Sequence, residues 1–205
     1  METIQLVIEF VGTFAFAISG IRLAASKHFD WFGGYVVGLV TAIGGGTLRD
    51  VMLGQTPFWM TNKIYIICTA LALIVVIIFK KQLVRLNHTW FLFDTLGLAL
   101  FTIAGLQKTL FFHQPYWVAI VMGCITGAAG GVMRDVLVNQ IPLIFRKEIY
   151  AIACLAGGLV YYLSALLHLG IEITVISSFV SVVSIRVLAV KYHITLPHLK
   201  NVEPE

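Results

Sequence analysis

Charged residues are scarce in this sequence: they make up 12% of its 205 residues, whereas 59% are hydrophobic. A soluble globular protein needs about a quarter of its residues charged. The mean hydropathy of the chain is +0.93. This composition excludes a soluble globule and predicts an integral membrane protein.

Cysteine is also rare, and histidine is poorly placed for chemistry. Cys68, Cys124 and Cys154 stand singly in apolar segments, without a C-x-x-C pair or a histidine near enough in sequence to complete a metal site. The six histidines lie in loops or near segment ends, and none forms a Ser-His or His-carboxylate arrangement. No glycine-rich phosphate loop follows a strand. We therefore expect no enzyme activity, no cofactor and no structural metal site.

Long apolar runs, in contrast, fill most of the chain. They cover residues 4–22, 31–54, 61–79, 89–107, 115–139, 148–167 and 170–190. About 20 residues at 1.5 Å per residue cross roughly 30 Å of hydrocarbon. The sequence therefore predicts an all-α membrane protein with seven transmembrane helices, short loops and no soluble domain.

The basic residues are divided by membrane side rather than gathered in a patch that would bind nucleic acid. With seven spans, ten of them fall on one side, and Lys63 and Lys108 fall on the other. The ten are Arg22, Lys27, Lys80, Lys81, Arg85, Arg146, Lys147, Arg186, Lys191 and Lys200. The positive-inside rule makes their side cytoplasmic. We expect a multi-pass protein of the cytoplasmic (inner) membrane, with its N-terminus outside and its C-terminus inside, in contact with lipid and with no nucleic-acid partner.

The sequence also repeats itself at an offset of 85 residues. Residues 44–50, G-G-G-T-L-R-D, recur as residues 129–135, A-G-G-V-M-R-D, and the same register aligns Glu9 with Asp94. The register extends over the first six apolar runs, three in each copy. Because three spans are an odd number, the second copy must enter from the opposite side, which defines an inverted repeat. The predicted divisions of this single membrane domain, 1–205, are a first three-helix repeat 1–85, an inverted repeat 86–168, and a seventh helix with a cytoplasmic tail 169–205.

Each copy places glycines near the middle of an apolar run. A glycine costs a helix about 1 kcal/mol relative to alanine, so a break or kink is expected in the second and fifth helices. Backbone groups freed at that depth must be buried in protein or line a wet cavity. The alternative is that the glycines let two helices pack closely. The residues expected at the kinks and along a pore are Ser19, Thr41, Gly44, Gly45, Gly46, Thr126, Ala129, Gly130 and Gly131.

Six ionisable residues lie inside the first, second, fourth and fifth spans, where each costs roughly 2.5 to 3.5 kcal/mol at the centre of a helix. Topology sorts them into two groups. The outer group is Glu9, Arg49 and Asp50, and the inner group is Asp94, Arg134 and Asp135. Each group carries a formal charge of −1, so pairing of its arginine with one carboxylate leaves the other to attract a cation. The alternative is that the charges form salt bridges between helices, with the aspartates capping or hydrated.

The paired G-G-G-x-x-R-D and A-G-G-x-x-R-D motifs resemble the prokaryotic branch of the trimeric intracellular cation channel family. Similar bacterial sequences have also been labelled glycine transporters. The resemblance implies a bacterial or archaeal homotrimer with a hydrophilic pore in each subunit, bounded by spans one, two, four and five. It implies transient passage of K⁺, with Na⁺ passing too. Ala129 departs from the triple glycine of the first copy.

We therefore expect passive, K⁺-favouring conduction. Acidic attraction of ions is assigned to Glu9, Asp50, Asp94 and Asp135, and Arg49 and Arg134 are their charge partners. The main rival is a secondary carrier for glycine or another small zwitterion, because inverted repeats with midplane breaks are also a carrier architecture. A membrane scaffold without transport is a third hypothesis.

Overall fold

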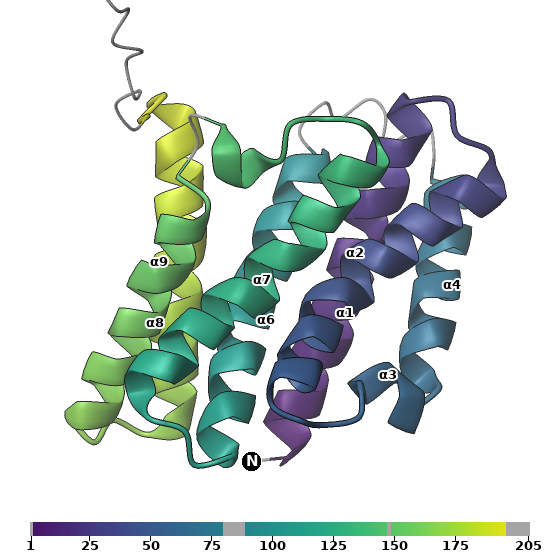
Figure 1. The fold of residues 1–205 in the computed structure, drawn as a ribbon. Coiled ribbons are helices and arrows are strands. Elements are labelled where there is room, and N and C mark those ends of the chain that lie inside the picture. The colour runs from purple at the N-terminus through teal and green to yellow at the C-terminus, as the bar shows by residue number, and fades with distance from the viewer. Residues whose placement is uncertain (1, 80–88, 147–148, 196–205) are drawn as a thin grey trace, which may run out of the picture.

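The computed structural model describes residues 2–79, 89–146 and 149–195, and over these ranges the chain is helical without a strand (Figure 1). The long helices are α1 Glu2–Ser26, α2 Trp31–Met52, α4 Ile64–Ile78, α6 Thr89–Phe111, α7 Tyr116–Leu137, α8 Ala151–Leu166 and α9 Ile171–Lys191. Two short elements, α3 Phe58–Thr61 and the 3-10 helix η1 Leu143–Phe145, lie between them. The all-α prediction is confirmed, and each predicted apolar run overlaps one long helix.

The long helices differ in how well they suit a bilayer. Five of those described, α1, α2, α6, α7 and α9, are long and apolar enough to cross a membrane. Helices α4 and α8 are apolar but have 15 and 16 residues. At 1.5 Å per residue they reach about 23 Å, short of a 30 Å hydrocarbon core. That all seven helices span the membrane stays a prediction.

The elements recur in the same order 85 residues apart. The series α1, α2, α3 and α4 is followed by α6, α7, η1 and α8, and α2 and α7 begin at Trp31 and Tyr116. Element α3 lies at one end of the bundle and η1 at the other, so the second series is inverted (Figure 1). The predicted repeat boundary at 85/86 lies outside the described residues. So do Lys80, Lys81, Arg85, Lys147 and Lys200 of the topology count.

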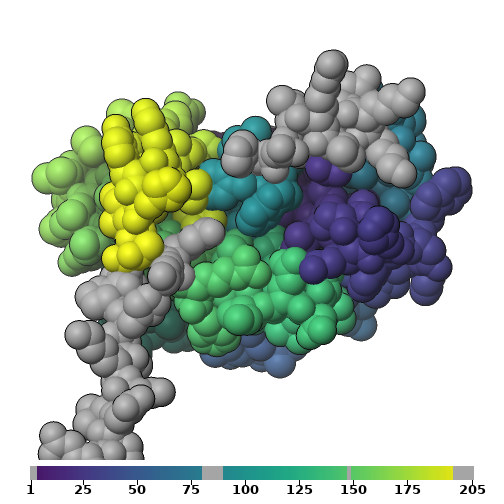
Figure 2. Space-filling view, turned by 90° about the horizontal axis from the view of Figure 1, so that it is seen from above, coloured from purple at the N-terminus to yellow at the C-terminus, as the bar shows by residue number. Residues whose placement is uncertain are grey.

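Helices α1, α2, α6 and α7 form the centre of the bundle, in which α1 packs on α6 and α2 crosses α7. Helix α4 flanks α1, whereas α9 packs on α8 and α6. Seen from above, α8 and α9 lie on one side and the N-terminal helices on the other, with α6 and α7 between them (Figure 2). The four central helices are those in which the motifs lie.

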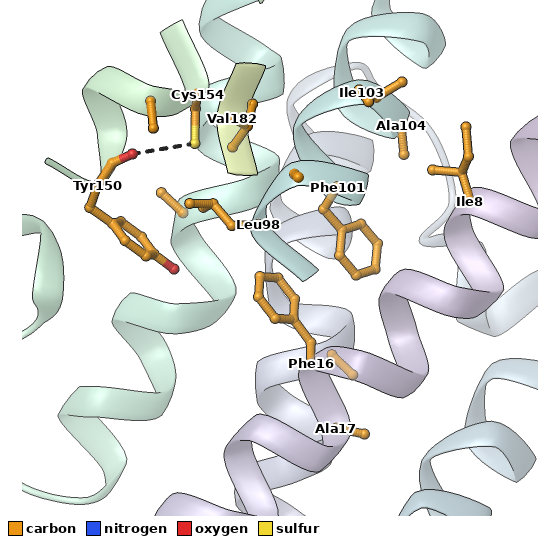
Figure 3. Close-up of a cluster of buried hydrophobic side chains, with 14 of the residues drawn as sticks. Ile8, Phe16, Ala17, Leu98, Phe101, Ile103, Ala104, Tyr150, Cys154 and Val182 are labelled. Atoms are coloured by element: carbon orange, nitrogen blue, oxygen red, sulfur yellow. Dashed lines mark hydrogen bonds between the residues drawn. The ribbon is translucent and has the colours of Figure 1, made fainter. Parts of the chain in front are cut away.

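The contact between α1 and α6 joins equivalent positions of the two repeats. The rings of Phe16 and Phe101 are stacked, with centroids 5.4 Å apart and planes at 17° (Figure 3). Both side chains are buried. A Cβ atom on Gly97 would overlap the Phe16 ring, and one on Gly12 would lie 3.3 Å from Phe101. Small residues therefore make room for one aromatic pair at the middle of the bundle.

The predicted break at the glycine runs is absent, because α2 and α7 are each one uninterrupted helix. The glycines instead allow a close crossing. A Cβ atom on Gly45 would overlap the carbonyl oxygen of Thr126, and one on Gly130 would overlap that of Thr41. The alternative of close packing thus accounts for these two glycines. Kinks of α2 and α7 remain a prediction.

Candidate functional site

Each Arg-Asp pair stands at the end of a long helix, where the backbone turns in the same way in both repeats. Gly54 has a φ of 68°, and its counterpart Asn139 has a φ of 54°. Glycine and asparagine are the residues that most readily adopt this left-handed conformation at a helix C-terminus. The next residue in each repeat, a glutamine, donates its backbone N–H to the aspartate carbonyl at 2.8 Å. The sequence thus ends both helices with the same turn.

The two aspartates join these turns to the short elements that follow. The Oδ2 atom of Asp50 accepts the backbone N–H of Phe58 at 2.8 Å, and that of Asp135 accepts the backbone N–H of Leu143 at 2.9 Å. Phe58 begins α3 and Leu143 begins η1. A carboxylate is favourable at a helix N-terminus, where backbone N–H groups lack partners. Asp50 and Asp135 therefore have a structural role in this conformation.

We call the charged side chains around Arg49 the outer cluster. Arg49 Nε donates to Asp50 Oδ1 at 2.8 Å, and its Nη1 lies 3.6 Å from Glu9 Oε1. The hydroxyl of Tyr65 donates to Glu9 Oε2 at 2.7 Å. Lys108, at the end of α6, places Nζ 2.9 Å from Asp50 Oδ1. Residues from α1, α2, α4 and α6 thus meet in one ionic network.

We call the corresponding side chains around Arg134 the inner cluster. Arg134 donates to the Oδ1 atoms of Asp94 and Asp135, the latter from Nε at 2.9 Å. Its Nη1 also donates to Oγ of Ser19 at 2.9 Å, and Ser19 belongs to the first repeat. Arg186, on α9, places Nη2 3.8 Å from Asp94 Oδ2. The guanidinium of Arg186 lies 5.0 Å from the ring centroid of Phe91 and 4.8 Å from that of Tyr150.

The predicted formal charge of −1 for each group is wrong. Lys108 adds a positive charge to the outer cluster and Arg186 adds one to the inner, so each contains two carboxylates and two cations. The topology prediction places Arg186 among the charges of the cytoplasmic side, yet its side chain is 0% exposed. The available signal was its position inside the seventh apolar run, 170–190. Neither cluster has a carboxylate in excess.

A cavity of about 540 Å³, which we call the outer vestibule, adjoins the outer cluster. Its polar lining residues are Gln5, Glu9, Gln55, Thr56, Thr61, Asn62, Tyr65 and Lys108. A second cavity, of about 680 Å³, is lined by Arg22, Trp31 and Trp90 among others, and by no residue of the inner cluster. Of the two clusters, the outer one is therefore the one that adjoins a described cavity.

The region between the clusters is packed. Phe16 and Phe101 are each 1% exposed, and Thr41 and Thr126 are fully buried beside the crossing of α2 and α7. The hydroxyls of Thr41 and Thr126 donate to Val37 and Met122 of their own helices, each at 2.6 Å. They are satisfied locally, as is usual for such residues in membrane helices. In this conformation the midplane is closed.

The other predicted pore residues are placed around this closed region. Ser19 joins the inner cluster, and a Cβ atom on Gly44 would lie 2.6 Å from Met133 Sδ. A Cβ atom on Gly46 would meet the ring of Phe58, and one on Gly131 the hydroxyl of Tyr150, each at 2.5 Å. Ala129 is half-buried. Within the described part of the chain, no group of three or more His, Cys, Asp or Glu is arranged to hold a metal ion.

The fold is that of the trimeric intracellular cation channels. The chain is similar to the crystal structure of such a channel from Rhodobacter sphaeroides, with a TM-score of 0.88 and 28% identity, over 93% of this chain and 99% of that one. A second prokaryotic channel of this kind matches with a TM-score of 0.87 and 30% identity, over 96% and 100% of the two chains. The resemblance seen in the sequence is confirmed, and these solved structures are ion channels rather than enzymes.

The chain belongs to the family described as "Glycine transporter", whose sequence model matches residues 6–81 and 91–165. It is 39% identical to an inner membrane protein of Escherichia coli named UPF0126 inner membrane protein YadS, over 93% of both chains. It is also 38% identical to a UPF0126 membrane protein of Vibrio cholerae, over 93% of this chain and 80% of that one. The chain therefore has the fold of proteins named as channels and belongs to a family named for transport.

Proposed function

We propose that the protein is a channel for monovalent cations, K⁺ above Na⁺, which conducts passively through a hydrophilic path inside each subunit of a homotrimer. One observation carries the proposal: paired ionic clusters on α1, α2, α6 and α7 lie on the two sides of a packed midplane, in a fold shared with solved cation channels. Buried charge of this kind in membrane helices is expensive and is typical of ion pathways.

The outer vestibule provides the entrance. Glu9 lines it with a carboxylate and draws cations inward, while the inner cluster forms the corresponding site on the far side. Arg49 and Arg134 hold the carboxylates in place, and Asp50 and Asp135, each paired with a cation in the closed conformation, are the further acidic groups beside the path. Passage requires α2 and α7 to separate or kink at Gly45 and Gly130, where backbone carbonyls of Thr41 and Thr126 then replace water around the ion.

The protein lies in the cytoplasmic membrane with its N-terminus outside, which makes the vestibule extracellular or periplasmic. All seven long helices cross the bilayer, and α4 and α8 shorten the path by local thinning of the lipid. Trimer formation follows the solved channels to which the chain is similar.

A secondary carrier for glycine or another small zwitterion is the second candidate. The observation that favours it is the charge balance of the clusters, since two carboxylates and two cations can hold both ends of a zwitterion. A closed midplane between two clusters is also the arrangement expected of a carrier that exposes its site to one side at a time.

Flux through purified protein in liposomes distinguishes the two functions. A channel passes K⁺ in ohmic single-channel steps, whereas a carrier exchanges labelled glycine saturably without unitary currents. For the channel we expect Glu9→Gln to lower conductance and Glu172→Gln, which removes an exposed carboxylate on α9, to leave it unchanged. Saturable glycine exchange without K⁺ current would contradict the channel.

A further inference from the structure

Two of the three cysteines meet where α7 packs on α8. The thiol of Cys124, on α7, donates to the backbone carbonyl of Ala151 at 3.6 Å. The thiol of Cys154, on α8, donates to the backbone carbonyl of Tyr150 at 3.7 Å (Figure 3). The two thiols thus reach the carbonyls of consecutive residues, and they also interact with each other. They form a neighbouring pair inside the bundle.

The packing of α7 on α8 explains this pairing. Residues three apart share a face of a helix, so Cys154 lies on the face of α8 that Cys124 contacts at Ala151. A Cβ atom on Gly158 would lie 3.0 Å from Cγ2 of Ile120. These two residues stand one turn away from the cysteines, in the opposite directions expected of antiparallel helices. The small glycine therefore brings α7 and α8 close together beside the thiols.

The thiol pair is a feature of the second repeat alone. The positions 85 residues earlier are Leu39 and Thr69, so the duplicated fold does not require two thiols. Cys154 is fully buried and Cys124 is half-buried. Among the described residues, no third His, Cys, Asp or Glu joins them in a group that could hold a metal ion. A ligand of this pair therefore binds to two sulfur atoms.

Two thiol sulfurs suit a soft metal cation. Thiolates select Cu⁺ among the biological metals, whereas K⁺ is bound by oxygen atoms and Zn²⁺ needs three or four protein ligands. Cu⁺ and Ag⁺ accept two sulfurs in a line, which at a metal–sulfur bond of about 2.3 Å lie about 4.6 Å apart. Two thiols that already interact reach this separation by a small adjustment of their side chains.

We propose that Cys124 and Cys154 form a two-sulfur site for a soft monovalent cation, Ag⁺ or Cu⁺, which joins α7 to α8. Both thiols are protonated, since each donates a hydrogen bond. Two metal–sulfur bonds form as two S–H bonds break, so M⁺ and two thiols give [M(SR)₂]⁻ and two protons that leave to solvent. No oxidant or reductant takes part in this step.

Arg186 stabilises the negative charge of this complex. Its guanidinium interacts with Cys154 and lies 4.8 Å from the ring centroid of Tyr150, whose carbonyl accepts the Cys154 thiol. A positive charge beside a cysteine favours the thiolate, which is the form that binds metal. Arg186 also pairs with Asp94, so the site adjoins the inner cluster.

Metal binding has a consequence for conduction, and this step rests on the proposed channel function. The proposed path opens when α7 separates from α2 or kinks at Gly130. Cys124 stands two residues before Thr126, whose carbonyl lies at the crossing of these helices. A sulfur–metal–sulfur link to α8 restrains this segment of α7. Bound metal therefore keeps the path closed.

Binding is measured first, by calorimetry on the full chain purified in detergent with its cysteines reduced, in chloride-free buffer with Ag⁺ as the probe. We expect one tightly bound Ag⁺ per chain and the release of two protons, read from buffers that differ in ionisation enthalpy. Zn²⁺ is the matched probe and should bind far more weakly, because two ligands do not complete its shell. Zn²⁺ binding as tight as that of Ag⁺, or the release of fewer than two protons, would overturn the proposal.

Two variants test the sulfur ligands independently, so that misfolding of one leaves the other informative. Cys124→Ser and Cys154→Ser should each weaken Ag⁺ binding at least about 100-fold, because loss of a residue that merely orients a metal ligand already costs 10- to 100-fold. Cys68→Ser is the matched control, since this thiol lies on α4 and donates to the carbonyl of Phe10 on α1. Unchanged affinity in both Cys124→Ser and Cys154→Ser, or an equal loss in Cys68→Ser, would overturn the site.

The flux measurement separates failure of the site from failure of the channel. In liposomes, saturating Ag⁺ should remove most of the K⁺ flux, excess dithiothreitol should restore it, and Cys124→Ser should be insensitive. K⁺ flux without Ag⁺ binding would overturn the site and leave the channel. Ag⁺ binding that needs both cysteines, in a protein that passes no K⁺ even without metal, would overturn the channel and leave the site. Flux that is indifferent to bound Ag⁺ would overturn the restraint on α7.

Discussion

The outer and inner clusters contain the same types of charge but differ in their access to solvent. Each has a guanidinium and two carboxylates from equivalent positions of the two repeats. The fourth member breaks the symmetry. Lys108 comes from α6, is 19% exposed and adjoins the vestibule, whereas Arg186 comes from α9, outside the repeats, and is 0% exposed. The duplicated part builds both networks, and the added cations differ in their exposure to solvent.

This difference has an energetic consequence. A partly exposed ion pair is screened by water and contributes little to stability. A fully buried network depends on every partner, because removal of one leaves a charge without compensation in a medium of low dielectric constant. We therefore expect the inner cluster to be the more important for stability and the outer cluster to be the more tolerant of change.

Removal of the central arginine should give the largest effect. Arg134→Met leaves Asp94 and Asp135 fully buried with Arg186 as the remaining cation, so we expect a loss of about 3 to 5 kcal/mol in the free energy of unfolding. Arg49→Met leaves Glu9 beside a cavity that water can enter, and should cost about 2 kcal/mol. Unfolding in mixed detergent–SDS micelles measures both. Equal losses would show that solvent access does not distinguish the clusters.

Removal of the fourth member of each cluster, Arg186 or Lys108, should lower the free energy of unfolding by less. The loss should again be larger for the inner cluster. Arg186→Met removes the ionic contact with Asp94 and the contacts with the rings of Phe91 and Tyr150, at a cost of about 2 kcal/mol. Lys108→Met should cost below about 1 kcal/mol, because its ion pair is partly exposed. The same unfolding assay applies, with Lys191→Met, at the exposed end of α9, as the control for loss of a positive charge. A larger loss in Lys108→Met than in Arg186→Met would reverse the comparison.

Much of this arrangement could be predicted from the sequence, because it depends on long apolar segments and their number rather than on single contacts. Apolar runs fix where helices form in a membrane chain, because every backbone group must be paired within its own helix. An odd number of runs in each copy fixes the inversion. The number of runs also places Glu9 and Arg49 in one half of the membrane and Asp94 and Arg134 in the other. In the structure, Glu9 lies beside Arg49 and Asp94 lies beside Arg134.

The additional cations could not be predicted in the same way. Lys108 and Arg186 belong to helices whose neighbours are set by packing, and no repeat motif marks either residue. The glycine runs were ambiguous for a similar reason. A run of glycines is compatible with a broken helix and with a close crossing, and the decision depends on the carbonyl of Thr126 or Thr41 from a distant helix.

The crossing of α2 and α7 supplies the symmetric control for the comparison. Gly45→Ala and Gly130→Ala each place a Cβ atom against a backbone carbonyl of the opposite helix. Overpacking of about 1 to 3 kcal/mol outweighs the gain of about 1 kcal/mol in helix propensity, so each should lose about 1 kcal/mol.

Gly34→Ala in α2 is the matched control for these two variants, since its Cβ would meet nothing within 4 Å, and it should be neutral or stabilising in the same unfolding assay. Equal losses at Gly45 and Gly130 would place the difference between the clusters in their solvent access and fourth cations. A clearly larger loss at one of them would mean that the asymmetry already begins at the crossing, within the duplicated part of the chain.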